Sequence, residues 1–325
     1  MIDWVVWGIP LILKLQALGN WLTPPMKLFT FLGQEQFYLL VMPAILWCID
    51  VGLGLRLGLI LLTSNMLNSV LKLAFGLPRP YWIARRVAAL STESSFGLPS
   101  GHAQNAVALW GRMAVAIQRR WALAAAIALM FLISLSRIEL GVHFPADVIA
   151  GWVVGTIVLL GFLSFDSGVS ARLSRASRGS RLTVAVVAPL VLVGLGLAVR
   201  SVRAWIGFPP GWAEAAAAAA PLAAPIDPLG TSDILAVGGI FVGFAVGGAL
   251  LVAWGRFRVE GPWSHRLARF GLGAVGVFVI YLGLAAIFPR GPSLLPTLLR
   301  MFRYALVGFW IAYLAPRVFV WAKLS

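Results

Sequence analysis

The chain consists of long apolar runs separated by short polar, mostly basic, stretches. Charge-free runs lie between Arg181 and Arg200, between Asp233 and Arg256, and between Arg269 and Arg290. Shorter runs, or runs bounded by acidic residues, follow Glu35, Arg56, His102, Arg120, Asp147 and Arg303. A helix of about 20 apolar residues crosses a bilayer, so the pattern predicts an all-α, polytopic transmembrane helical bundle of about nine spans. The runs are continuous and lack ten-residue alternation, which favours helices over a transmembrane barrel.

The N-terminal segment is apolar but makes a short and weak span. Residues 3–19 include Trp4, Trp7, Pro10 and Lys14. We expect an amphipathic helix that lies at the membrane interface, with tryptophan as its anchor. A tenth span is the alternative. Because no basic start precedes a cleavage site, a cleaved signal peptide is not expected.

Composition supports a membrane protein and excludes a soluble one. The chain is 60% hydrophobic and 11% charged, with a mean hydropathy of +0.92, whereas soluble domains carry about 25% charged residues. The net charge of +15 comes from basic clusters between apolar runs, a pattern typical of cytoplasmic loops rather than of a nucleic-acid-binding protein. The single cysteine, Cys48, excludes an intramolecular disulfide framework and a cysteine-rich metal site.

The basic loops predict an orientation. With early spans expected at residues 36–50, 54–74, 101–118, 121–137 and 144–164, the arginine-rich connections fall on one face. The residues on that face are Arg56, Arg112, Arg119, Arg120, Arg172, Arg175, Arg178, Arg181, Arg256, Arg258, Arg266, Arg269, Arg317 and Lys323. By the positive-inside tendency this face is cytoplasmic. Residues 75–100, 137–145 and 205–231 are then outside a cytoplasmic (inner) membrane that the chain crosses many times.

A serine- and arginine-rich stretch separates two halves of the chain. We expect a core at residues 1–165, a basic cytoplasmic linker at 166–181 and a four-span C-terminal region at 182–325. The unusual polar residues lie mostly in the first half. The second half contains an alanine-rich segment, Ala215 to Ala220, between Pro210 and Pro221.

Three polar clusters are expected at the same, outer ends of their helices. The first is Lys72, six residues, then Arg79-Pro80, followed by Tyr81 and Trp82. The second is Pro99-Ser100-Gly101-His102. The third is Ser136-Arg137, five residues, His143, three residues, then Asp147. Intramembrane polar groups are costly and mark function by default, so we expect the clusters to converge on one pocket.

The clusters have the chemistry of a phosphate site. Lys72, Arg79 and Arg137 supply three positive charges, and an arginine fork matches phosphate oxygens with paired hydrogen bonds. Ser100 and Gly101 precede a helix whose N-terminal N–H groups favour an anion. Glycine allows the backbone to approach closely.

The histidines supply the reaction. Asp147 can hold one ring nitrogen of His143 protonated, which leaves the other nitrogen free to attack phosphorus. His102 would protonate the leaving oxygen and later activate water. We expect no metal and no cofactor, because Asp147 and Glu139 are the only nearby carboxylates and no HExxH spacing occurs.

The motifs resemble those of the type 2 phosphatidic acid phosphatase superfamily. Its signatures KX6RP, PSGH and SRX5HX3D are all matched within residues 72–147. The resemblance implies the same roles: His143 is the nucleophile, Asp147 is the partner of His143, and His102 is the acid. The implied phosphate ligands are Lys72, Arg79, Ser100, Gly101 and Arg137.

A closer similarity to the glucose-6-phosphatase branch rests on RPYW (79–82), PSGHA (99–103) and SRIELGVHFPADVIAG (136–151). That branch has nine spans and a non-cytoplasmic site. Tyr81, Trp82 and Glu139 are the expected substrate-pocket residues, although Glu139 stands where that branch has an aromatic residue. The length, the scarcity of cysteine and the Arg/Ala bias indicate a bacterial protein, and so a lipid substrate.

The sequence therefore predicts a metal-independent membrane phosphatase that forms a phosphohistidine. The expected partners are the bilayer and a lipid phosphate: phosphatidate, phosphatidylglycerophosphate, or an isoprenyl phosphate or diphosphate. One alternative is a sugar phosphate phosphatase of the glucose-6-phosphatase type. Another is a non-catalytic lipid-binding or transport protein that has kept the anion pocket. Oligomeric state is left open.

Overall fold

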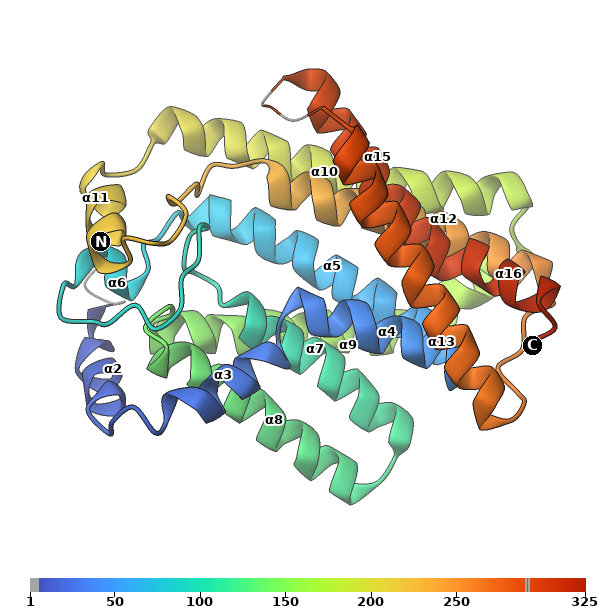
Figure 1. The fold of residues 1–325 in the computed structure, drawn as a ribbon, viewed down its shortest axis with the longest axis horizontal. Coiled ribbons are helices and arrows are strands. Elements are labelled where there is room, and N and C mark those ends of the chain that lie inside the picture. Colours follow the sequence, from blue (N-terminus) through green and yellow to red (C-terminus); the bar gives the residue numbers. More distant parts are fainter. Residues whose placement is uncertain (1–5, 290, 292) are drawn as a thin grey trace. The chain divides into compact units, whose positions relative to one another are not determined.

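The structure is a computed structural model that describes residues 6–289, 291 and 293–325 (Figure 1). The described residues form helices and no strand. In chain order they are α2 (Ile9–Gln16), α3 (Thr23–Phe31), α4 (Glu35–Cys48), α5 (Val51–Phe75), α6 (Pro80–Ile83), α7 (Gly101–Ile117), α8 (Arg120–Glu139), α9 (Pro145–Arg175), α10 (Arg178–Ile206), α11 (Gly211–Ala219), α12 (Ser232–Trp254), α13 (Trp263–Phe278), the π-helical η1 (Val279–Gly283), α14 (Leu284–Ile287), α15 (Leu294–Phe309), the π-helical η2 (Trp310–Leu314) and α16 (Ala315–Trp321). The predicted all-α class is confirmed.

Length and apolar composition identify seven candidate membrane spans in the described part of the chain. They comprise α5 with α6, then α8, α9, α10 and α12, α13 through α14, and α15 through α16. The spans expected at 36–50 and 101–118 are α4 and α7, which have 14 and 17 residues. These two are shorter than all seven spans, which have 20 to 33 residues, so the predicted count of nine is not confirmed.

The chain forms two compact units that interleave along the sequence. Unit 1 contains residues 1–37, 67–160 and 196–231, and unit 2 contains residues 38–66, 161–195 and 232–325. All three predicted clusters lie in unit 1. The functional boundaries expected at residues 165 and 182 stay a prediction.

In unit 1, α7 and α9 approach each other closely through two glycines. A Cβ on Gly151 would lie 2.6 Å from the backbone oxygen of Ser100, and one on Gly155 would lie 2.5 Å from that of Gln104. Four-residue spacing puts both glycines on one face of α9, and small residues allow helix backbones to meet. This contact fixes the first turn of α7 against the first turns of α9.

In unit 2, a glycine stripe on α12 receives α15 and η2. Added Cβ atoms on Gly239 and Gly243 would lie 2.4 Å from the Met301 oxygen and 1.8 Å from the Ala305 oxygen. A Cβ added to Gly247 would lie 2.9 Å from Ala312 Cβ. The same small-residue packing therefore holds the C-terminal helices together.

The helix expected within residues 3–19 is α2, which contacts the core through Gln16. The Gln16 amide donates to the backbone oxygens of Ala88 and Glu139, both at 2.9 Å. Of the two tryptophans expected to anchor this helix, Trp4 lies outside the described residues and Trp7 is exposed. The interfacial position of α2 stays a prediction.

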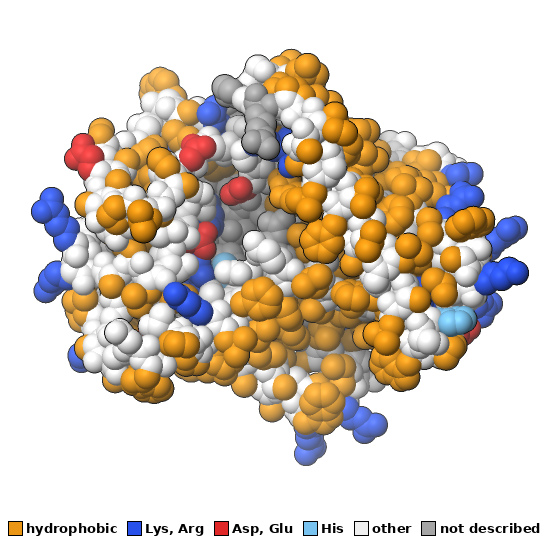
Figure 2. Space-filling model, in the orientation of Figure 1, with side chains coloured by type: hydrophobic (Ala, Val, Ile, Leu, Met, Phe, Trp, Pro, Cys, Tyr) orange, Lys and Arg blue, Asp and Glu red, His pale blue; other side chains and the backbone are white. Residues whose placement is uncertain are grey.

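Hydrophobic side chains cover much of the surface shown in Figure 2. Trp121, Ile127 and Phe131 on α8 are each more than half exposed, as are Ile157 and Leu160 on α9. Apolar outer faces on long helices are what contact with lipid requires. The chain is accordingly a multi-pass membrane protein.

Candidate active site

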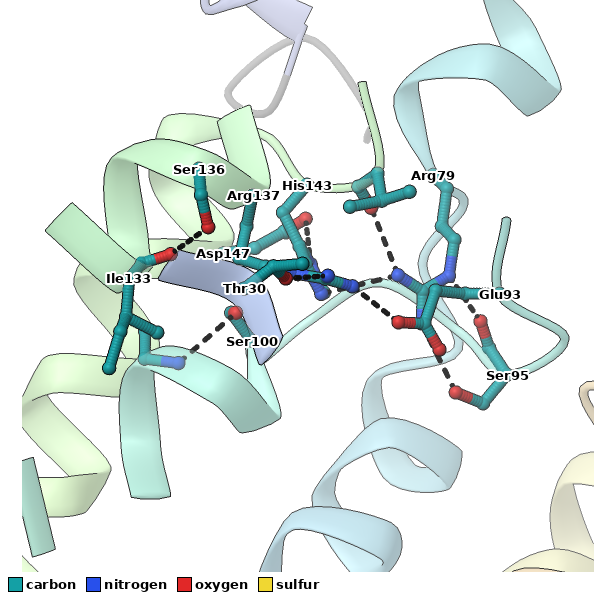
Figure 3. Close-up of polar contacts among 12 residues, drawn as sticks. Thr30, Arg79, Glu93, Ser95, Ser100, Ile133, Ser136, Arg137, His143 and Asp147 are labelled. Atoms are coloured by element: carbon teal, nitrogen blue, oxygen red, sulfur yellow. Dashed lines mark hydrogen bonds and ion pairs between the residues drawn. The ribbon is translucent and has the colours of Figure 1, made fainter. Parts of the chain in front are cut away.

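The three predicted clusters meet in unit 1 at the ends of α5, α7, α8 and α9 (Figure 3). Lys72 lies in the last turn of α5, and His102 in the first turn of α7. Arg137 lies in the last turn of α8, and Asp147 in the first turn of α9. Because these helix ends meet, Arg79 and His143, which are 64 positions apart in sequence, come into contact.

His143 is held by a charge on each side of its ring. Its Nδ1 lies 3.1 Å from Asp147 Oδ2, and its Nε2 lies 3.2 Å from Arg79 Nη1. A guanidinium can only donate, so Nε2 is the acceptor and Nδ1 carries the proton. Burial, and then the charges of Arg79 and Arg137, hold the pKa of His143 well below its ordinary value. The ring is neutral, with the lone pair on Nε2.

Asp147 is fixed by the start of its own helix. Pro145 suits the first position of α9, where no backbone donor is needed. The carboxylate at the third position accepts the Phe144 N–H at 2.9 Å on the same Oδ2 atom that faces His143. This is the side-chain half of a capping box. One oxygen of Asp147 therefore caps α9 and orients the imidazole.

Ser100 connects the second cluster to the third. Its backbone N–H donates to the Asp147 backbone oxygen at 2.9 Å, and its hydroxyl caps α7 by accepting the Ala103 N–H at 3.5 Å. A Cβ on Gly101 would lie 2.9 Å from Asn68 Oδ1, so this position needs glycine. The Asn68 amide donates to the oxygens of Pro99 and Gln104.

His102 follows at the start of α7, and its Nε2 is buried without a hydrogen-bond partner among the described residues. The end of α3 covers the ring, because a Cβ on Gly33 would lie 2.8 Å from His102 Cδ2. A buried polar atom without a partner costs free energy unless something bonds it. An incoming ligand would supply that bond.

Arg79 is fully buried, and the loop before α7 surrounds it. It donates to the backbone oxygens of Ser95, Phe96 and Val142 at 2.6, 3.0 and 2.9 Å, and to the Ser95 hydroxyl at 3.1 Å. The same hydroxyl accepts from Lys72 Nζ at 2.9 Å. Ser95 therefore brings the two basic residues of the first cluster together.

Arg137 is buried, and its guanidinium donates hydrogen bonds to two different segments of the chain. One terminal nitrogen donates to Thr30 of α3 and the other to the Glu93 carboxylate. Its Nε is buried without a partner in the described structure. Burial alone raises the pKa of Glu93, but the charges of Arg137 and Arg79 outweigh it and hold that pKa well below its ordinary value.

The expected pocket residues separate into two groups. Tyr81 is buried and fixes the backbone of Glu93. Its hydroxyl donates to the backbone oxygen of Glu93 at 2.9 Å and accepts from the backbone N–H of Glu93 at 3.1 Å. Trp82 packs edge-on against Tyr81, with ring centroids 6.2 Å apart. Glu139 instead accepts from Thr23 of α3 at 2.9 Å, a contact that turns its carboxylate to α3 rather than to the histidines.

Sequence reasoning missed Thr30, Glu93 and Ser95, although each contacts a predicted residue. The available signal was weak. Glu93 is one of eleven acidic residues and lies in the polar run STESS between the first two motifs. No described group of three or more His, Cys, Asp or Glu side chains could hold a metal. Independence from metals stays a prediction.

Comparison with known proteins gives the family. Residues 53–169 match the PAP2 superfamily, and this range contains all three motifs. Residues 235–325 match the PAP2 superfamily phosphatase transmembrane extension. The chain is 32% identical over 171 residues to phosphatidylglycerophosphatase B of Bacillus subtilis, covering 46% of this chain and 77% of that protein. The chain belongs to the PAP2 superfamily. The predicted membership of this superfamily is confirmed.

Other PAP2 relatives are longer. Lipid phosphate phosphatase delta of Arabidopsis thaliana is 29% identical over 174 residues, which are 48% of this chain and 41% of that one. Sphingosine-1-phosphate phosphatase 1 of Rattus norvegicus is 30% identical over 139 residues, 41% and 32% of the two chains. The chain therefore spans less than half of these relatives. The crystal structure of a transmembrane PAP2 phosphatidylglycerolphosphate phosphatase from Bacillus subtilis aligns with a TM-score of 0.41 at 28% identity, over 48% of this chain and 83% of that one.

Proposed function

We propose that this PAP2 protein hydrolyses the phosphomonoester or diphosphate of a membrane lipid through a phosphohistidine on His143. The observation that carries the proposal is the His143 ring, which is neutral, protonated on Nδ1 by its contact with Asp147, and lies beside Arg79. Two buried nitrogens that have no partner in the described part of the chain, His102 Nε2 and Arg137 Nε, add donors for a phosphate. The relatives named for lipid phosphates favour a lipid substrate over a sugar phosphate.

The reaction has two steps. His143 Nε2 attacks phosphorus while the bond from phosphorus to the leaving oxygen breaks, and His102 gives that oxygen a proton. Water then attacks phosphorus, His102 takes the proton of the water, and the bond to Nε2 breaks. Arg79 turns its N–H from Nε2 to a phosphate oxygen, and with Arg137 and Lys72 it stabilises the equatorial charge.

The site is proposed to face the extracytoplasmic side of the cytoplasmic membrane. Arg56 of α5, Arg112 of α7, Arg120 of α8 and Arg172 of α9 lie toward the opposite ends of the helices that carry the site, which supports this orientation. A reporter fused near Gly97 would be active only in the periplasm or its equivalent. A reporter that is active in the cytoplasm would reverse the topology.

The decisive experiment measures phosphate release by the detergent-purified protein in EDTA. The panel contains phosphatidate, phosphatidylglycerophosphate, undecaprenyl diphosphate and glucose 6-phosphate. His143→Ala should abolish release, and rapid acid-free quenching of the wild type should trap phosphate on protein. His265→Ala is the matched control, because that histidine lies in the first turn of α13, in unit 2, whereas the site lies in unit 1. Turnover by His143→Ala would refute the nucleophile, and preference for glucose 6-phosphate would refute the lipid substrate.

A further inference from the structure

A cavity in unit 1 adjoins the phosphate site and has two unlike walls. Its volume is about 270 Å³. The polar wall comes from Tyr81, Thr92, Glu93 and Ser94. The other wall comes from the alanine-rich segment and the chain after it: Ala216, Ala217, Ala220, Pro221, Ala223, Ala224, Pro225 and Ile226. One side of the cavity therefore offers hydrogen bonds, and the other offers small apolar surfaces.

The apolar wall is held in place by rings. Trp212 of α11 lies 6.2 Å from Trp82 and stacks on Phe208 at 6.2 Å between centroids. Phe208 in turn meets Phe96 edge-on at 6.2 Å, and Phe96 lies 6.5 Å from Trp82. Aromatic pairs in this range contribute beyond their buried area. Residues from 208 onward are thus fixed against the same loop that surrounds Arg79.

Glu93 belongs to both the cavity and the phosphate site. Glu93 lines the cavity, its side chain is 31% exposed, and one carboxylate oxygen is paired with the buried Arg137. The Tyr81 hydroxyl fixes the backbone of Glu93 at both its N–H and its oxygen. Because Arg137 Nε has no hydrogen-bond partner among the described residues, Arg137 can bind phosphate and hold Glu93 at the same time. The carboxylate would then lie beside the bound phosphate.

A carboxylate beside a phosphate is unfavourable, because like charges a few ångströms apart repel. A donor on the substrate, placed between the two anions, would offset this repulsion by bonding to both. A hydroxyl or ammonium group next to the ester carbon has that position. A cavity of this volume is too small for a lipid chain but suits the polar end of the leaving group.

We propose that this cavity binds the leaving-group end of the substrate, and that Glu93 selects lipid alcohols with a hydroxyl or ammonium group adjacent to the phosphoester carbon. The inference rests on the proposed function and adds the class of alcohol that is released. Glu93 accepts the substrate donor, and the alanine wall accommodates the carbon skeleton. Phosphate lipids that lack this donor are poor substrates.

The test compares two substrates that differ in one donor, lysophosphatidate and its 2-deoxy analogue. The wild type should hydrolyse lysophosphatidate with a kcat/KM at least about tenfold higher, as expected for a hydrogen bond to a charged group. Glu93→Ala should bring the two values to within about twofold. Any effect of the substitution on phosphoryl transfer cancels in the ratio of the two kcat/KM values. Tyr81→Phe, which releases the Glu93 backbone, should reduce the ratio in part and should leave the apparent pKa values of the pH–rate profile unchanged.

A second pair of variants tests the cavity without relying on the activity of the Glu93 variants. Ala220→Leu fills the cavity and should raise KM for lysophosphatidate at least about tenfold, while orthovanadate inhibition stays unchanged. Ala218→Leu is the matched control, because this neighbouring alanine is exposed and does not line the cavity. It should leave both constants unchanged.

The outcomes separate this inference from the proposed function. Equal hydrolysis of both substrates by the wild type would refute the subsite and leave the phosphatase intact. Faster turnover of both substrates by Glu93→Gln would also refute it, because Glu93 would then only compete with phosphate. No hydrolysis of either substrate by the wild type, with no orthovanadate-sensitive turnover of any lipid phosphate, would overturn the proposed function itself.

Discussion

Replacing Asp147 by asparagine tests whether the carboxylate charge, rather than its shape, activates His143. Asparagine can place its amide oxygen where Oδ2 now accepts from Phe144 N and faces His143 Nδ1, and its NH₂ where Oδ1 has no partner. The geometry is retained and the charge is lost. Charge-assisted hydrogen bonds are about twice as strong as neutral ones, so two bonds lose about 1–3 kcal/mol in total. This loss corresponds to a fall in kcat of about 5- to 150-fold.

The assay is kcat for phosphate release from the preferred lipid phosphate, together with the melting temperature in the same detergent. Asp147→Asn should melt close to the wild type, whereas Asp147→Ala should also lose about 1–3 kcal/mol because the buried Phe144 N–H is left without an acceptor. Asp166→Asn is the matched control on α9, since Asp166 pairs with Arg56 instead. A kcat for Asp147→Asn within twofold of the wild type would refute the assigned role of Asp147.

Three further outcomes follow from the same structure. Gly151→Ala places a Cβ 2.6 Å from the Ser100 backbone oxygen, so it should lower stability by about 1–3 kcal/mol and reduce activity. Gly161→Ala is the control, because no described atom lies within 4 Å of the added Cβ; it should be neutral in thermal melts. The lowered pKa values of His143 and Glu93 mean that the folded state binds fewer protons than the unfolded chain. The melting temperature should therefore fall on acidification, below about pH 6.5 because of His143 and below about pH 4.3 because of Glu93. His143→Gln should flatten the part of the melting curve against pH that His143 causes. EDTA should leave kcat unchanged, and orthovanadate should inhibit competitively because it mimics the pentacoordinate transition state; loss of activity in EDTA that Mg²⁺ restores would contradict the proposed chemistry.

The parts of the site that could be predicted are those with rigid spacing. His143 and Asp147 are four residues apart across a helix start, so a short chain segment determines their contact. The apolar runs predicted which helix ends would share a side of the membrane, and the structure brings Arg79 to His143 and Ser100 to Asp147. These contacts follow from helix direction and length, both of which are visible in the sequence.

The remaining parts depend on irregular chain and on tertiary packing. Glu93 and Ser95 lie in a loop without periodicity, and only the folded structure shows that they bond the basic residues. Thr30 comes from α3, a helix outside the expected spans, and contacts Arg137 across 107 positions of sequence. Glu139 shows the opposite case: its place one turn before His143 indicated a pocket residue, but the Thr23 hydroxyl binds its carboxylate.

The alanine-rich wall of the cavity lies outside both parts of the chain that match the family. The motifs that carry the proposed chemistry lie within residues 53–169, and the C-terminal helices lie within 235–325, the two ranges that match the family. The cavity wall, from Ala216 to Ile226, lies in the interval between them. A connecting segment of this kind can change the alcohol that is released without altering any residue that touches phosphorus. Exchanging residues 213–226 between members of the superfamily is therefore a direct route to redesigned substrate preference, because it leaves the attachment by Trp82, Phe96, Phe208 and Trp212 in place.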